Sequence, residues 1–134
     1  MSQQPHITNR HGITGLLWLF KQAKSWDLSD VELATLLGVT TTALHSWLRE
    51  IQSCNSECPE LPARVVERIG LFLGLHKALV LLTPACHEEI AAEWFTKPIH
   101  LWGLNGTSIR VHLLDDPSTE TLIELVRQIR SVTV

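Results

Sequence analysis

The sequence lacks a long uncharged apolar run. Its most apolar stretch, residues 69–82, is interrupted by His76 and Lys77 and is shorter than the roughly 20 residues that a membrane-spanning helix needs. The start, Met-Ser-Gln-Gln-Pro, also lacks the basic segment and apolar stretch of a secretory signal. We therefore expect a cytoplasmic protein without a membrane segment.

An excess of positive charge is also missing. The chain has 11 Lys and Arg against 14 Asp and Glu, which gives a formal net charge of −3. Proteins that bind DNA mainly through its phosphates are basic, at least locally. Any nucleic-acid role of this chain must therefore be modest, or must depend on a dimer or a partner chain.

Cysteine is scarce, and the three cysteines are an odd number, which suits a reducing compartment. A zinc site formed by Cys54, Cys58 and the Cys86-His87 pair is one interpretation. Its spacing is loose and no second ligand pair accompanies it, so we favour unligated thiols. We expect no metal and no cofactor.

No catalytic motif stands out. The serines are not in a nucleophile-elbow pattern, and no glycine-rich loop could hold a phosphate. The carboxylates fall at expected helix caps or on expected solvent-facing positions. The sequence therefore predicts that the chain is not an enzyme.

Helical spacing of apolar residues predicts an all-α fold: an N-terminal helix-turn-helix bundle joined by a long central helix to a small helical C-terminal domain. Residues 1–12 are polar and are expected to be a flexible arm, and residues 13–52 are expected to form the helix-turn-helix domain. Ser29 and Glu32 form a capping box, Gly38 ends that helix, and Thr40 caps the next. Two short helices joined by a glycine turn are typical of a helix-turn-helix.

Residues 52–59 are polar, end in proline, and are the expected linker. The central helix, residues 60–82, is apolar on more than one face, which is typical of a helix at the centre of a fold. Gly70 and Gly74 cost that helix about 1 kcal/mol each relative to alanine. We expect another helix to approach closely at this face, and we expect a homodimer.

The C-terminal domain, residues 60–134, continues with a short helix up to Phe95, an irregular apolar loop at residues 99–106, a helix at 107–114 and a last helix at 118–131. Leu101, Trp102 and Leu104 are too apolar to stay in water. They pack either on the chain's own core or on a partner, for which a central tryptophan would be a typical hot spot.

Several segments of the second half, in this order, resemble the toxin-binding domain of the Xre/MbcA/ParS antitoxins: Glu67-Arg68-Ile69, Lys77-Ala78-Leu79, Ala92-Glu93-Trp94-Phe95, Lys97-Pro98, the loop from Trp102-Gly103 to Asn105-Gly106, and Leu113-Leu114. The first half, with Trp26-Asp27-Leu28-Ser29 before Leu36-Leu37-Gly38-Val39, is similar to their degenerate Xre-type helix-turn-helix. The resemblance covers roughly residues 14–132.

This resemblance implies an antitoxin of a type II toxin–antitoxin system, whose partner is a RES-domain toxin that consumes NAD. The C-terminal domain would cover the active-site cleft of the toxin, and the helix-turn-helix would dimerise and bind operator DNA for autoregulation. The toxin contacts are then expected at Trp94, Lys97, Leu101, Trp102, Leu104, Arg127, Arg130 and Val134.

DNA contacts are expected on the outward positions of the recognition helix, which are Thr41, Thr42, His45, Ser46 and Arg49. Residues 14–52 hold three basic against four acidic residues. We therefore expect weak operator binding by the chain alone and stronger binding by the toxin complex. The alternative is that this domain serves in dimerisation and packing alone.

Two other functions remain open at this stage: a stand-alone helix-turn-helix transcriptional regulator, and a structural adaptor with a vestigial helix-turn-helix. Two side chains of the central helix favour structural interpretations. His76 lies on the apolar stripe and is expected to be a core histidine, and Arg68 is expected to form an ion pair or to bind a loop carbonyl.

Overall fold

A computed structural model describes residues 4–53, 60–83, 86–87 and 89–132 of the chain. These residues form seven helices and no strand, which confirms the predicted all-α class. The helices are α1 (Gln4–Ser25), α2 (Asp30–Leu37), α3 (Thr41–Ser53), α4 (Ala63–Leu81), α5 (Glu89–Thr96), α6 (Ile109–Asp115) and α7 (Thr119–Val132). Among the described residues, no helix combines the length and the apolarity needed to cross a membrane.

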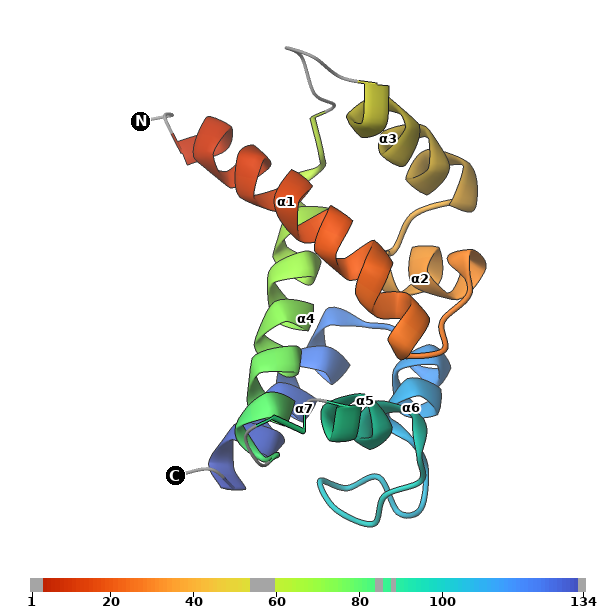
Figure 1. The fold of residues 1–134 in the computed structure, drawn as a ribbon, viewed down its shortest axis with the longest axis vertical. Helices are drawn as coiled ribbons and strands as arrows, with labels where there is room; N and C mark the ends of the chain where they lie inside the picture. The colour runs from red at the N-terminus through yellow and green to blue at the C-terminus, as the bar shows by residue number, and fades with distance from the viewer. Residues whose placement is uncertain (1–3, 54–59, 84–85, 88, 133–134) are drawn as a thin grey trace.

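The central helix α4 organises the fold. The helix α1 crosses it on one side and α7 packs along it on another (Figure 1). The helix α3 lies toward one end of the molecule, and α5 and the loop that follows it lie toward the other; α2 and α6 contact each other between these ends (Figure 1). The two ends of the molecule therefore present different helices to a partner.

Residues 4–12, which were expected to belong to a flexible N-terminal arm, are helical instead, because α1 begins at Gln4. The helix is held against α4 through two glycines. A Cβ atom on Gly12 would lie 2.8 Å from Cγ2 of Val66, and one on Gly15 would lie 2.6 Å from Cγ2 of Ile69. The helix extends from this anchored crossing toward the N-terminus.

Within one chain, the close helix crossing lies at Gly12 and Gly15, and the described residues place no helix close to Gly70 or Gly74. A Cβ atom added at Gly70 or Gly74 would meet no atom within 4 Å. This part of α4 faces open space within the chain. At Gly15, in contrast, a side chain as small as a methyl group would force the neighbouring Ile69 to move.

The core is continuous across the expected domain boundary at residues 52–60. Trp26, which is fully buried at the end of α1, stacks on Phe95 of α5 with ring centroids 4.3 Å apart. Phe72 of α4 lies beside the same indole at 6.2 Å. His76 packs against Trp18 at 5.2 Å, so it lies among core aromatic rings as expected.

The predicted helix caps are confirmed. Both hydrogen bonds of the Ser29–Glu32 capping box are present, and Gly38 adopts a left-handed conformation with φ of 77°. The Thr40 hydroxyl accepts from the Ala43 N–H at 3.1 Å. These local hydrogen bonds define both ends of α2 and the start of α3.

Two arginines bind the helix-turn-helix half to the other half. Arg68 of α4 donates to the Leu36 carbonyl at 2.8 Å and to the Thr119 hydroxyl at 3.2 Å. Of the two expectations for Arg68, an ion pair or a loop carbonyl, the structure shows a carbonyl contact, and this carbonyl belongs to the last turn of α2. Arg110 of α6 donates to the Asp27 carbonyl at 2.9 Å and pairs with Glu32.

The capping box and Arg110 act on the same carboxylate. The Ser29 backbone N–H donates to Glu32 and holds the pKa of that carboxyl below its usual value, and Arg110 lowers the pKa further. Glu32 is therefore charged at neutral pH. Its charge stabilises both the start of α2 and the contact of α2 with α6.

Candidate DNA-binding and partner-binding surfaces

The α2–α3 unit has the form of a helix-turn-helix. The turn at residues 38–40 joins the two helices, and α3 buries Leu44 and Leu48. The opposite side of α3 faces solvent at the end of the molecule (Figure 1). This exposed side is the candidate DNA-binding surface.

The five predicted DNA-contact residues differ in exposure. Thr42, His45 and Arg49 are exposed, whereas Thr41 and Ser46 are half-buried. The three exposed residues are spaced three and four positions apart, so they lie on one side of α3. The structure therefore brings three of the five together as an exposed stripe.

Acidic groups accompany this stripe. The His45 Nε2 atom lies 2.8 Å from Asp30 Oδ2, which ties α3 to the start of α2. The Ser46 hydroxyl donates to Glu50 at 3.4 Å. In the part of the chain that the structure describes, Arg49 makes no ion pair. Arg49 is thus the cation on α3 that is available to a phosphate or a guanine edge.

The connection between α5 and α6 consists of two consecutive tight turns. The first is closed by a hydrogen bond from the Leu104 N–H to the Leu101 carbonyl at 3.0 Å, and the second by one from the Thr107 N–H to the Leu104 carbonyl at 3.0 Å. The central residues of both turns have positive φ, as type I′ turns require: Trp102 (56°), Gly103 (76°), Asn105 (53°) and Gly106 (89°).

Trp102 is unusual in this position. A bulky residue rarely adopts positive φ, and such a conformation costs of order 1–3 kcal/mol. An isolated bridge between Ile99 and Thr107 closes the base of the connection and holds it in place. The backbone therefore holds the Trp102 side chain at the tip of the connection at the expense of local strain.

Trp94 and Trp102 form a half-buried aromatic pair, with ring centroids 5.5 Å apart. The indole N–H groups of both are buried and have no hydrogen-bond acceptor among the described residues. The neighbouring Leu101 is 50% exposed. We call Trp94, Lys97, Leu101 and Trp102 the indole surface.

The other residues that were predicted to contact the toxin differ in burial and position. Leu104 is 3% exposed and belongs to the core, so the prediction that it contacts a partner is corrected. Its side chain is part of the hydrophobic core instead. Lys97 pairs with Glu93 at 3.5 Å on an exposed part of α5. Val134 lies outside the described residues.

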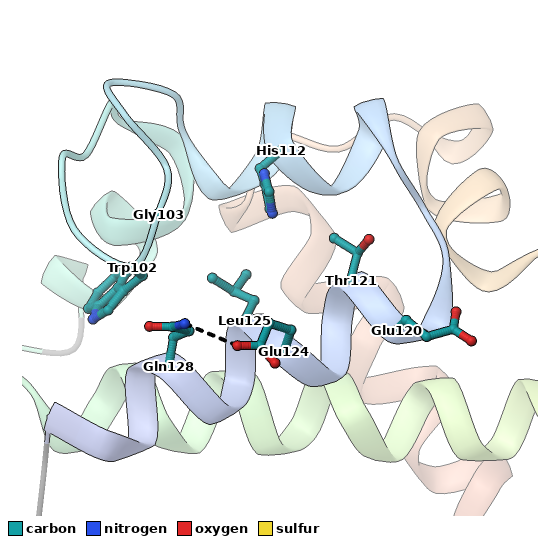
Figure 2. Close-up of a pocket in the computed structure, with 8 residues that line it drawn as sticks. All are labelled: Trp102, Gly103, His112, Glu120, Thr121, Glu124, Leu125 and Gln128. Atoms are coloured by element: carbon teal, nitrogen blue, oxygen red, sulfur yellow. Dashed lines mark hydrogen bonds between the residues drawn. The ribbon is translucent and has the colours of Figure 1, made fainter.

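A cleft opens beside the indole surface (Figure 2). It has a volume of about 410 Å³ and lies between the first turn, α6 and α7. Trp102 lies at one end of it, Glu120 lies at the other, and His112 points from α6 toward α7 (Figure 2). The floor is formed by α7, where Gln128 donates to Glu124 at 3.0 Å.

A second, more apolar groove lies between α4 and α7. It has a volume of about 460 Å³ and is lined by Leu71, Ile123, Val126, Arg127, Arg130 and Ser131. Arg127 pairs with Glu124 at 3.2 Å, on the rim that faces the cleft. Arg127 and Arg130, which were predicted to contact the toxin, therefore border this groove. They lie on the other side of α7 from Trp102.

The α7 residues of the cleft were not among the predicted site residues. Glu120, Glu124 and Gln128 are spaced four residues apart and so form one stripe of the helix. This spacing could have identified the stripe. The facing His112 could not have been found, because its position depends on how α6 packs.

Within the part of the chain that the structure describes, there is no candidate metal centre. Among the described residues, no group of three or more His, Cys, Asp or Glu side chains is arranged to hold a metal ion. Cys86 is exposed, and Cys54 and Cys58 lie outside the described residues.

In comparisons with known proteins, the chain has no significant match to a protein-family model, to a curated protein or to a solved structure.

Proposed function

We propose that this chain is an antitoxin that binds a RES-type, NAD-consuming toxin through the indole surface and silences it. The toxin class comes from the sequence resemblance to the Xre/MbcA/ParS antitoxins. The observation that carries the proposal is the half-buried Trp94–Trp102 pair, with Leu101 exposed beside it. Aromatic residues at the centre of an apolar patch are the usual anchors of protein interfaces.

The cleft suits a basic side chain of the partner. Glu124 is already paired with Arg127, whereas Glu120, at the end of the cleft away from Trp102 (Figure 2), makes no ion pair among the described residues. A guanidinium group can bind a carboxylate through two hydrogen bonds. An arginine of the toxin placed at this end of the cleft would pair with Glu120.

A second role, operator binding, is supported by the exposed stripe on α3. Arg49 is accessible and makes no ion pair among the described residues, and Thr42 and His45 lie on the same side of the helix. Asp30 and Glu50 lie close to this stripe and oppose the approach of phosphates. Binding by one chain would be weak, and a complex that holds several copies would bind more tightly.

The test of the first role is co-expression of the full chain with the toxin encoded by the adjoining reading frame. We expect the wild-type chain to restore growth and cellular NAD content. We expect Leu101→Asp to lower the affinity for the toxin about tenfold or more, because it places a charge in the apolar part of the interface. Affinity is measured by calorimetry on purified proteins.

A matched control is Val31→Asp. Val31 is 62% exposed on α2, at the other half of the molecule, so the same change should leave toxin affinity unaltered. Equal loss of affinity in both variants would contradict the assignment of the indole surface. Failure of the wild-type chain to restore growth would leave the stand-alone regulator as the better proposal.

The test of the second role is Arg49→Ala. We expect weaker binding to the DNA upstream of the operon and a decrease of about 1 in the salt-dependence slope, because one phosphate contact is lost. A fluorescence-anisotropy titration at several salt concentrations measures both quantities. Lys97→Ala, which removes the same charge at the other end of the molecule, is the control. An unchanged slope for Arg49→Ala would exclude this residue from the DNA surface.

A further inference from the structure

The outer side of α4, between α1 and α7, has no partner within the described chain. Residues at the helical spacing of three and four form this side, and we call them the outer face of α4: Ala63, Glu67, Gly70, Gly74, Lys77 and Leu81. Gly74 is half-buried and the other five are exposed. Leu81 alone is 73% exposed, although it is a large apolar residue.

The order of residues on this face is symmetric about Phe72, which lies on the opposite, buried side of α4. Gly70 and Gly74 lie two positions from Phe72 in either direction. Glu67 and Lys77 lie five positions away, and Ala63 and Leu81 lie nine positions away. Each residue of this face on one side of Phe72 therefore has a counterpart at the same distance on the other side.

This symmetry has a consequence for two copies of the helix. When two identical helices pack antiparallel about this centre, positions equally far from Phe72 come to the same level along the axis. Glu67 of one copy then faces Lys77 of the second copy, and the same pair forms again on the other side of the two-fold axis. Leu81 faces Ala63 in the same way at both ends.

The charged groups of Glu67 and Lys77 are available for pairs between two copies. Within the described residues, neither Glu67 nor Lys77 makes an ion pair. A parallel arrangement would instead place Glu67 against Glu67 and Lys77 against Lys77, which repel each other. Charge complementarity therefore selects the antiparallel arrangement of two copies.

The glycines permit this approach. A Cβ atom at Gly70 or Gly74 would meet no atom of the described residues within 4 Å, so packing among these residues does not require glycine at either position. Glycine inside a helix is unfavourable. Two glycines at the centre of an unpartnered face would let the backbones of two helices come into contact.

We propose that the chain forms a homodimer through antiparallel packing of the outer face of α4 on the same face of a second copy. The axis passes beside Gly70 and Gly74, and two Glu67–Lys77 pairs flank it. This assembly uses neither the indole surface nor α3. The proposal does not depend on the proposed function.

The experiment is sedimentation equilibrium of the full chain and its variants. We expect a reversible dimer for the wild type. Glu67→Lys places Lys opposite Lys at two sites, so we expect the dissociation constant to rise about tenfold or more. The double variant Glu67→Lys with Lys77→Glu restores opposite charges in the antiparallel register, so we expect dimerisation close to that of the wild type.

Two further variants complete the experiment. Glu120→Lys makes the same change of net charge on α7 and should leave the dissociation constant unchanged. Gly70→Leu meets no atom within its own chain near the added Cβ, so it should fold and remain monomeric. A monomeric wild-type chain at high micromolar concentration overturns the proposal. So does a dimer that Glu67→Lys and Gly70→Leu leave intact, or a double variant no better than Glu67→Lys.

Discussion

Trp26→Ala is expected to lower the free energy of unfolding by about 3–5 kcal/mol, because it leaves a large cavity in the core. The Trp26 side chain is fully buried and stacks on Phe95, with Phe72 beside it. A domain of this size has a total stability of about 5–15 kcal/mol. The variant should therefore be marginally folded. Urea denaturation followed by far-UV circular dichroism measures the loss without relying on tryptophan fluorescence.

Two control variants show whether the loss of stability comes from the contact of Trp26 with Phe95. Trp26→Phe keeps an aromatic ring against Phe95 and should lose clearly less stability than the alanine variant. Val111→Ala removes a side chain that is 47% exposed and should change the stability little. A loss below about 1 kcal/mol for Trp26→Ala would contradict the central position of this indole.

Residues 60–134 alone are expected not to fold cooperatively. Without the first three helices, Phe95 loses its stacking partner Trp26, and the side of α4 that carries Val66 and Ile69 loses α1. Arg68 also loses the Leu36 carbonyl. The fragment should show reduced helicity, no sharp thermal transition and binding of a hydrophobic dye.

Mixing the fragment with residues 1–59 provides the control. If the continuous core is what the fragment lacks, the mixture should regain helicity and a cooperative transition. A sharp transition of residues 60–134 alone, at the temperature seen for the full chain, would contradict this expectation. It would also mean that the boundary at residues 52–60 separates independent domains.

Local signals explain why the sequence predicted the helices well. The Ser29–Glu32 capping box, Gly38, and proline or aspartate at helix ends act over three or four residues, and they define most helix boundaries without tertiary contacts. The N-terminus of α1 has no such signal. Its polar first residues gave no apolar pattern, so the helix was predicted to begin after them.

Tertiary packing explains what the sequence could not predict. All four glycines of α1 and α4 have the same intrinsic effect on a helix, and only the structure shows that Gly12 and Gly15 lie at a crossing whereas Gly70 and Gly74 face outward. Leu101 and Leu104 are the same residue type three positions apart. The two tight turns leave the first half-exposed and bury the second.

The placement of α3 and the indole surface at opposite ends of one core (Figure 1) bears on regulation. The two proposed sites share no residue, so a ligand at one end does not occupy the site at the other. Apart from the avidity of a complex that holds several copies, coupling between the proposed DNA and toxin sites within one chain would pass through the core, where Arg68 bonds both to Leu36 of α2 and to Thr119 of α7. Coupling of this kind is reciprocal: a toxin that tightens DNA binding through Arg68 would itself be bound more tightly on DNA.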